Sequence, residues 1–332
     1  MNVAFFLPRE SDLARLAGLD PDRDAPEFRR GERAWILQTF LRLRAAGFAS
    51  ELVDRVPAAG LVVYHAKHDR DVRRGVPPGG RPVLVGARAD NRQSLSAEFE
   101  LLQNGRFADG RSRHAVPHWP QPGLRPRDPE RGERLSRLAY KGFLDNLHPD
   151  FAGERWRSFL AARGIEWVVD AERYAGVAID RAALAWSDFH DIDALVAIRR
   201  RERKTDFSKP ATKLVNAWLA GVPALLGPEY AFRELRRGDL DYLEIGSLAE
   251  AEAAVDRLAS EPGLYRAMVD NGRRRAPEVD VAAVTAAWRR LLGETLPRLA
   301  REPGRERRRA WPLAARRAGR WLARSASLRP AR

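Results

Sequence analysis

A short stretch in the second half of the chain combines two lysines with the start of a predicted helix. Residues 209–228 read KPATKLVNAWLAGVPALLGP, in which Lys209 and Lys213 flank the expected first turn. We expect the helix to end at Gly221, and the apolar residues 222–226 predict a buried strand after it. Free N–H groups at a helix N-terminus favour an anion, and ammonium groups reinforce that preference. The stretch therefore predicts a phosphate site.

Further positive charges follow the strands predicted before this stretch. Arg199 comes directly after the apolar run 194–198, and two more arginines follow it. Gly142 ends the predicted strand 138–141, where a backbone could approach a ligand closely. Lys141 points to the same place. Ligands of open α/β sheets bind at the carboxyl ends of the strands. Each lysine alone would be a solvated surface charge, but together these groups predict a diphosphate site that needs no metal.

The first half of the chain offers general-base candidates near the ends of its predicted strands. Glu10, His65 and Asp90 each follow an apolar run, and Glu32 opens the first predicted helix. Each of them could remove a proton from an acceptor hydroxyl. Each could equally be a helix cap or one partner of a surface ion pair. The sequence does not choose among the four.

Other kinds of catalytic site have no support in the sequence. The run His65-Ala66-Lys67-His68-Asp69 has metal-binding residue types, but a lysine in its middle argues against a metal site. The chain contains no Walker-type loop, no G-x-G-x-x-G and no G-x-S-x-G. NTPase, dehydrogenase and hydrolase functions are therefore without a motif, and we expect neither a metal nor a cofactor.

The elements that would position these residues alternate between strands and helices. In the first part, a helix over 32–46 and continuous apolar strands at 61–64 and 82–85 predict a doubly wound parallel sheet. A stretch with five prolines follows, and the alternation then starts again. The predicted organisation is a first doubly wound α/β domain, a proline-rich linker, a second doubly wound α/β domain and a basic tail, with bounds 1–116, 117–134, 135–300 and 301–332.

Composition limits the class of protein. The 332 residues carry a formal net charge of +14, but 301–332 hold eleven arginines and only two glutamates, which supply +9 of it. The remainder is only mildly cationic, so we expect no nucleic-acid partner. The chain has no cysteine, which excludes disulfides and permits a reducing cytoplasm. No apolar run is long enough to span a membrane, and residues 3–7 predict a first strand, not a signal peptide.

The tail predicts a basic amphipathic helix over 311–324. An angle of about 100° per residue places Trp311, Trp321 and several alanines on one face and the arginines on the other. Such a helix fits an anionic membrane surface, with contact through 305–324. Docking on its own protein and an arginine-rich disordered tail are the two alternatives.

The second half of the chain resembles the GT-B glycosyltransferases. The run from KPATKLVNAWLAGVPALLGP to LYRAMVDNGRRRAPEV resembles their carboxy-terminal half, in which a nucleotide-sugar diphosphate sits at the helix start. RLAYKGFLDNL resembles the strand and loop that open that domain, and AVPHWPQPGLRPRD resembles the linker before it. The resemblance covers residues 114–300. Over 1–113 it rests on the alternation of elements.

The chain departs from many retaining members of that family at two positions. Asn216 and Ser208 stand where those members have two glutamates eight residues apart. The usual carboxylate contact to the donor is therefore absent, although an asparagine can still bond a hydroxyl. The departure leaves both the sugar and the stereochemical course open.

The resemblance implies an α/β fold of two doubly wound Rossmann-like domains facing a central cleft. It implies a metal-independent hexosyl- or deoxyhexosyltransferase that moves a sugar from a nucleotide sugar to a glycan or lipid-linked acceptor, in cell-surface polysaccharide synthesis. The protein would be cytoplasmic and peripheral on the inner face of the membrane. The donor would be held by Gly142, Arg199, Lys209, Thr212, Lys213 and Asn216. The alternatives are a scaffold that has lost catalysis and another GT-B enzyme such as a sugar-nucleotide epimerase.

Overall fold

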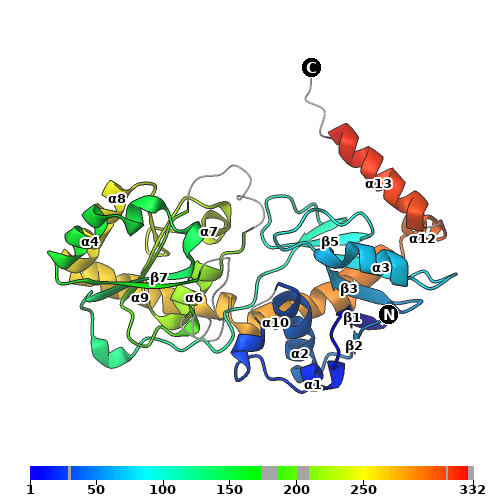
Figure 1. Ribbon diagram of the computed structural model, residues 1–332, viewed down its shortest axis with the longest axis horizontal. Coiled ribbons are helices and arrows are strands. Elements are labelled where there is room, and N and C mark those ends of the chain that lie inside the picture. Colours follow the sequence, from blue (N-terminus) through cyan, green and yellow to red (C-terminus); the bar gives the residue numbers. More distant parts are fainter. Residues whose placement is uncertain (29–30, 173–185, 200–208, 312, 328–332) are drawn as a thin grey trace. The chain divides into compact units, whose positions relative to one another are not determined.

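The computed structural model describes residues 1–28, 31–172, 186–199, 209–311 and 313–327, and it divides the chain into two compact units (Figure 1). The first unit comprises residues 1–21, 27–117 and 285–332. The second comprises residues 22–26 and 118–284. Each unit is built on one parallel sheet.

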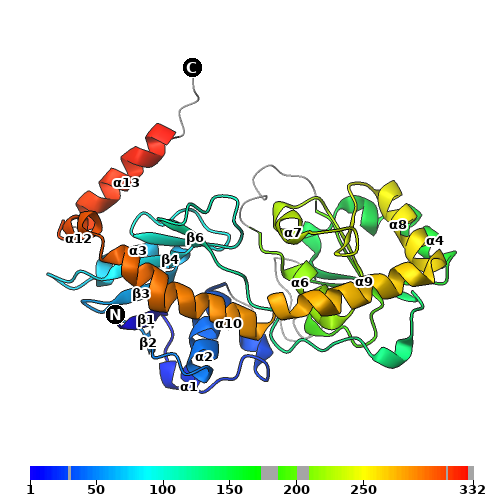
Figure 2. The same ribbon diagram turned by 180° about the vertical axis from the view of Figure 1, so that it is seen from behind.

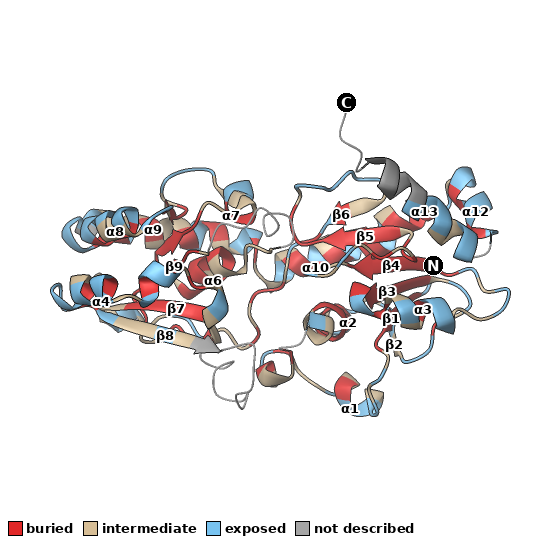
Figure 3. Cartoon of the chain, turned by 45° about the horizontal axis from the view of Figure 1, so that its top comes forward, coloured by how far each residue is buried: buried red, intermediate tan, exposed pale blue. Residues whose placement is uncertain are grey.

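The sheet of the first unit has six parallel strands in the order β2-β1-β3-β4-β5-β6. Every residue of β1, β3, β4 and β5 is buried (Figure 3). This burial explains the continuous apolar sequences of β1, of β4 and of β3 up to His65. The predicted strands at 3–7, 61–64 and 82–85 are confirmed, whereas the short strands β5 and β6 were not predicted. The strands span Val3–Phe6, Glu51–Val53, Leu61–His65, Val83–Ala87, Phe99–Leu102 and Arg113–Ala115 in chain order.

Helices from both ends of the chain cover this sheet. The predicted helix over 32–46 is a π-helical turn, Arg33–Leu37, that continues into α2, Gln38–Ala45. The late helix α10, Val281–Arg290, lies beside α2 (Figure 2), and the Trp288 and Trp35 rings meet edge to face with centroids 6.4 Å apart. Shorter elements complete the cover: α1 Leu13–Ala17, α3 Asp69–Gly75, the π-helical turn Leu291–Thr295 and α11 Leu296–Ala300.

The second sheet has five parallel strands in the order β11-β10-β9-β7-β8. Its first strand, β7, therefore has the next strand, β8, on one side and the later strands on the other. Three of the five, β7, β9 and β10, correspond to the strands predicted at 138–141, 194–198 and 222–226, with ends shifted by a few residues. In chain order from β7 they span Arg137–Phe143, Glu166–Glu172, Ala194–Ala197, Ala224–Leu226 and Leu243–Glu244.

Within the described residues, five helices of six to fourteen residues cover the second sheet. The Ser247 hydroxyl accepts a hydrogen bond from the Glu250 N–H at 3.2 Å and so caps α8. The Glu250 carboxylate in turn accepts from the Gly246 N–H at 2.7 Å. These helices are α4 Glu154–Ala161, α6 Thr212–Ala220, α7 Tyr230–Leu235, α8 Leu248–Ser260 and α9 Pro262–Arg275.

The proline-rich stretch from residue 118 onward packs as part of the second unit. Asp193, which is fully buried, accepts hydrogen bonds from the Arg127 and Arg131 guanidinium groups and from the Ser136 hydroxyl. Although burial raises the pKa of Asp193, these donors hold it at about 2. The division thus differs from the predicted bounds: the linker joins the second unit, and 285–300 join the first because their apolar face packs on its helices.

The described part of the tail docks on the first unit. It forms α12, Pro303–Arg309, and α13, Leu313–Ser327. The Arg309 guanidinium pairs with the Glu98 carboxylate at 2.7 Å, and Arg305 donates to the Arg111 carbonyl at 2.8 Å. For the described tail residues, which end at 327, the structure shows the second of the three alternatives, docking on the protein itself.

Candidate donor site and acid–base groups

The second sheet places the predicted diphosphate site at the reversal of its strand order. Strands β7 and β9 are neighbours at the point where the order reverses, and ligands of such sheets bind beyond the carboxyl ends of the strands there. Lys141 and Gly142 lie near the carboxyl end of β7, and Arg199 follows β9 by two residues. The topology therefore gathers the predicted groups at one edge.

The helix that starts at this edge has an N-cap residue without a polar side chain. Ala211 occupies the N-cap position of α6 and makes no side-chain capping hydrogen bond. The first N–H groups of the helix are consequently available to an anion. Thr212 is the first helical residue, and Lys209 lies three residues before it; both are half-buried. Gly221 ends the helix in the left-handed conformation, with a φ of 71°, as predicted.

Lys213 extends from this helix to the end of β7. Its Nζ donates to the Lys141 carbonyl and lies 4.9 Å from the centroid of the Tyr140 ring. Gly142 makes room for it: a Cβ at Gly142 would lie 2.9 Å from Nζ, and the φ of 150° also disfavours any other residue. The backbone conformation thus favours glycine at position 142, and any larger residue would also have to displace the Lys213 ammonium.

The site has an excess of positive charge. Burial, together with the nearby Arg199 guanidinium, lowers the pKa of Lys213 to about 7, although part of the side chain remains accessible. Glu229 acts in the opposite direction, but its carboxylate is engaged by the Arg199 Nε at 3.1 Å. A ligand with two or more negative charges would relieve the repulsion between the two cations and return Lys213 to its charged form.

Two predicted contacts take other roles. The buried Lys141 ammonium pairs with the Asp170 carboxylate, and burial lowers its pKa, so it is a structural cation and not a free donor. The Asn216 Oδ1 accepts from the Gln121 N–H at 3.1 Å and so holds the proline-rich stretch against α6. Its amide nitrogen is what remains for a ligand. Ser208 lies outside the described residues.

The first sheet also reverses its strand order, between β1 and β3. Glu10 follows β1 and His65 is the last residue of β3, so both of these candidates lie at the edge where a ligand is expected. Two non-glycine residues near the same edge have positive φ, Arg9 at 69° and Ala89 at 46°. Backbone strain of this kind is concentrated at functional sites.

Ion pairs occupy two of the four general-base candidates. The Glu10 carboxylate accepts from Arg33 twice, from Nε at 3.0 Å and from a terminal nitrogen at 2.9 Å. Glu32 pairs with the Lys67 ammonium. Burial raises the pKa of Glu32, but the hydrogen bond and charge of Lys67 outweigh it and hold this pKa below its ordinary value. The ion-pair alternative therefore describes both residues.

His65 and Asp90 are the two candidates with catalytic capacity left. His65 is 3% exposed, and its Nε2 finds no hydrogen-bond partner among the described residues. Burial lowers its pKa to about 4, so the imidazole is neutral at pH 7. Gly31 borders the ring, since a Cβ there would lie 3.1 Å from Nε2. Asp90 is exposed and accepts from the Gln103 amide at 3.1 Å.

The sequence analysis missed the partners that neutralise Glu10 and Glu32. Arg33 and Lys67 follow the candidates Glu32 and His65 by one and two residues, so adjacency was the available signal. Which carboxylate each cation would choose depends on the fold. No group of three or more potential metal ligands occurs within the described ranges. None of the helices described in this chain is long and apolar enough to cross a membrane.

Comparison with known proteins identifies the fold. No protein-family model matches the sequence. No curated protein matches it either. Among solved structures, TarM is 7% identical over 77% of this chain, with a TM-score of 0.52. HepE of Anabaena, in complex with UDP and glucose, is 12% identical over 88% of this chain and 99% of its own, with a TM-score of 0.51.

The chain spans 58% of the length of TarM, and thus under two thirds of it. These neighbours are GT-B glycosyltransferases, so the predicted fold class, two Rossmann-like units with parallel sheets, is confirmed. At these identities the likeness establishes the fold. What the chain does must be argued from its own residues.

Proposed function

We propose that the protein is a glycosyltransferase that moves a sugar from a nucleoside-diphosphate sugar to a glycan or lipid-linked acceptor. The observation that carries the proposal is the Lys213 ammonium, buried beside Arg199 at the uncapped start of α6. A buried cation whose pKa is lowered to about 7 is costly unless an anion compensates it. HepE, which shares the fold, has been solved with UDP and with UDP-glucose.

Lys213 and Arg199 would assist the reaction by offsetting the charge that develops on the departing nucleoside diphosphate. Preorganised donors of this kind are worth most where water is excluded, and removing one typically lowers kcat about 10²–10³-fold. The N–H groups of Thr212 and Lys213 would bond the phosphate oxygens. Since these groups already supply positive charge, we propose that the transfer is metal-independent.

On the acceptor side, His65 fits the role of a general base best. In the described structure Nδ1 accepts a hydrogen bond from the Lys67 N–H at 3.4 Å, which places the proton of the neutral ring on Nε2. To act as the base, Nε2, which has no hydrogen-bond partner among the described residues, would need the other tautomer, in which Nδ1 carries the proton and this long hydrogen bond is broken. Asp90 lies close enough to influence the pKa of His65 and would act either in its place or as its electrostatic partner. We also propose that the transferred sugar is a hexose or a deoxyhexose and that the enzyme acts in cell-surface polysaccharide synthesis.

Nucleotide titration by calorimetry tests the donor site. Lys213→Met removes the charge but keeps most of the side-chain volume, and we expect UDP or its counterpart in a panel of nucleoside diphosphates to bind at least about tenfold more weakly. Arg273→Gln is the matched control, because Arg273 is an exposed cation of the same unit. If Lys213→Met binds every nucleotide as tightly as the control, the proposed donor site is wrong.

A scaffold that has lost catalysis is the second candidate, and the ion pairs of Glu10 and Glu32 favour it. Turnover separates the two functions. An enzyme releases nucleoside diphosphate in proportion to its concentration when donor and a suitable acceptor are present. A scaffold binds the nucleotide but releases no product at any protein concentration.

The exposed apolar side of the tail supports a cytoplasmic enzyme that is peripheral on a membrane. Trp311 and Trp321 are 59% and 56% exposed, and Ala314 and Ala318 lie exposed between them in sequence. Tryptophan favours the membrane interface, so this surface suits a lipid-linked acceptor. Binding to anionic vesicles that is lost in Trp311→Ser/Trp321→Ser would support this; equal binding would contradict it.

A further inference from the structure

The tail docks with its arginines turned toward the protein. Arg317 donates to the Asp69 carboxylate and to the Ser96 hydroxyl. Arg320 donates to the backbone carbonyls of Leu95 and Ser96, at 2.7 Å and 3.0 Å. The charged face of α13 is thus the docked face, and its alanine and tryptophan face is exposed.

Between this tail and the first sheet lies a cavity of about 670 Å³. Its floor is formed by residues at the amino ends of β5 and β6, including Glu98 and Arg113. The lining of the cavity contains neither His65 nor Asp90. It is therefore a separate site within the first unit.

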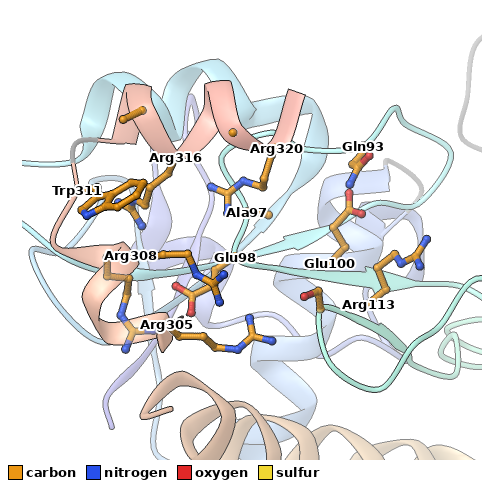
Figure 4. Close-up of a pocket in the computed structure, with 14 residues that line it drawn as sticks. Gln93, Ala97, Glu98, Glu100, Arg113, Arg305, Arg308, Trp311, Arg316 and Arg320 are labelled. Carbon is orange, nitrogen blue, oxygen red and sulfur yellow. Dashed lines mark hydrogen bonds and ion pairs between the residues drawn. The ribbon is translucent and has the colours of Figure 1, made fainter. Parts of the chain in front are cut away.

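The cavity is strongly cationic. Its lining contains two glutamates and six arginines, which come from the β6 edge and from both tail helices (Figure 4). Glu98 already pairs with Arg309 at 2.7 Å, and burial raises the pKa values of Glu98 and Glu100 despite the arginines around them. The two carboxylates cannot balance the lining. The six arginines are Arg113, Arg305, Arg308, Arg309, Arg316 and Arg320.

Two of these guanidinium groups lack a partner within the described chain. The Nε of Arg316 is buried and makes no hydrogen bond. Arg308 lies on an exposed position of α12, and its side chain makes no hydrogen bond or ion pair with the residues described. Figure 4 shows Arg308 and Arg316 among the side chains that line the cavity, one from each of the two tail helices. Arginines with unused donors in one cavity are suited to phosphate, which a guanidinium can bond through two oxygens.

We propose that this cavity binds a phosphate-bearing ligand with at least two negative charges, a phosphomonoester or a diphosphate. Arg308 and Arg316 bond its oxygens, and the wide mouth accepts a neutral remainder beside Trp311, which is on the rim. The volume is that of a site for a small molecule. The inference stands without the proposed glycosyl transfer, since it uses none of the donor-site residues.

Pyrophosphate titrations of the full-length protein test the site by calorimetry. The double variant Arg308→Gln/Arg316→Gln is compared with Arg301→Gln, which removes one exposed charge outside the cavity. We expect the double variant to bind at this site at least tenfold more weakly and Arg301→Gln to stay within twofold of the parent. A second binding event that is lost in Lys213→Met belongs to the donor site. The cavity site and the proposed donor site are therefore tested independently of each other.

The single variant Arg308→Gln guards against misfolding, because Arg308 is exposed and supports no contact of the fold. Its thermal midpoint should equal that of the parent, and its pyrophosphate affinity should fall severalfold. Parent-like pyrophosphate binding by both Arg308→Gln and the double variant overturns the proposal, as does a parent protein that binds pyrophosphate only through Lys213.

Vesicle sedimentation separates the two sources of such a phosphate. If a lipid headgroup is the ligand, phosphatidic-acid vesicles bind the parent, pyrophosphate displaces it, and the double variant stays in solution while phosphatidylcholine vesicles bind neither. If a soluble phosphate is the ligand, pyrophosphate binds as above and does not compete with any vesicle. Both outcomes support the site. Binding of phosphatidic-acid vesicles and pyrophosphate that is indifferent to Arg308 and Arg316 contradicts it.

Discussion

The carboxyl edges of the two sheets differ in how their charges are balanced. At the second sheet, Glu229 is the one carboxylate among the described residues that acts on both Lys213 and Arg199, and the N-cap of α6 is an alanine. At the first sheet, Glu10 and Glu32 each have their own cation. One edge therefore has an excess of positive charge, which on our proposal receives the diphosphate. At the other edge the carboxylates are paired, and on our proposal the neutral imidazole of His65 is the reactive group.

This difference indicates how donor binding and acceptor activation would each depend on electrostatics in the proposed transfer. A diphosphate brings its charge with it, so its site must hold uncompensated cations before it arrives. An acceptor hydroxyl is neutral and needs one correctly placed base. Each of the following changes disturbs one side of the comparison.

Replacing His65 should have the largest effect on the rate. We expect His65→Asn to lower kcat about 100-fold, since general-base catalysis contributes on the order of 10²–10⁴. Nucleotide affinity, which belongs to the other edge, should change less than about twofold. Steady-state kinetics and calorimetry on one preparation measure both quantities.

His68→Asn is the control for that change. His68 is also buried and follows the same strand, but it hydrogen-bonds Asp71 at 2.9 Å. We expect it to alter stability more than kcat. Equal loss of rate in the two variants would remove His65 from the proposed mechanism.

Gly142→Ala, which adds a Cβ at this position, should weaken nucleotide binding about tenfold. The kcat at saturating donor should stay within a few fold of that of the parent. An added Cβ would displace the Lys213 ammonium, from which it would be separated by 2.9 Å. Gly164→Ala is a matched control: its φ is also positive, at 65°, but no atom lies within 4 Å of a Cβ there. Backbone strain alone costs about 1 kcal/mol, so both variants should lose similar stability.

Only Gly142→Ala should change affinity, and calorimetry with the nucleotide measures it beside thermal melts. If Gly164→Ala loses the same affinity, strain explains the result and the contact with Lys213 does not.

Neutralising Glu10 should have the smallest effect on catalysis. Glu10→Gln keeps the shape but loses the charge that faces Arg33, so we expect less than a threefold change in kcat. Stability should fall by about 1–3 kcal/mol, because Arg33 is partly buried and would keep an incomplete partner. Urea denaturation and initial rates test this. A 100-fold loss of rate without loss of stability would make Glu10 the base instead of His65.

Local sequence patterns could predict the parts of this molecule that depend on near neighbours. The helix start at Lys213, its end at Gly221 and the cap at Ser247 all follow from residues within a few positions of each other. The buried strands followed from their continuous apolar runs. The short strands β5 and β6 did not, since Phe99–Leu102 carries a glutamate and Arg113–Ala115 has only three residues.

Contacts between distant segments were beyond such patterns. The sequence left open whether the tail meets a membrane, docks on its own protein or is disordered, and the partner of Arg317 is Asp69, more than two hundred residues away. Asn216 was expected to hold the donor, and nothing in the sequence indicated that its oxygen accepts from the N–H of residue 121. In each case the polar group found a partner that only the folded chain brings near it.

The protonation of Lys213 tests the central claim most directly. Without ligand its pKa is about 7, so at pH 8 most molecules hold it neutral. A bound diphosphate favours the charged form and raises that pKa, so binding at pH 8 should take up about one proton. For the same reason, nucleotide affinity should fall as the pH rises above 7.

Calorimetric titration of the nucleotide in buffers of different ionisation enthalpy counts the protons exchanged. We predict an uptake of close to one proton by the parent protein at pH 8 and at least half of that lost in Lys213→Met. Tight nucleotide binding with no proton uptake, or with the same uptake in Lys213→Met, would contradict the claim that this buried cation receives the diphosphate.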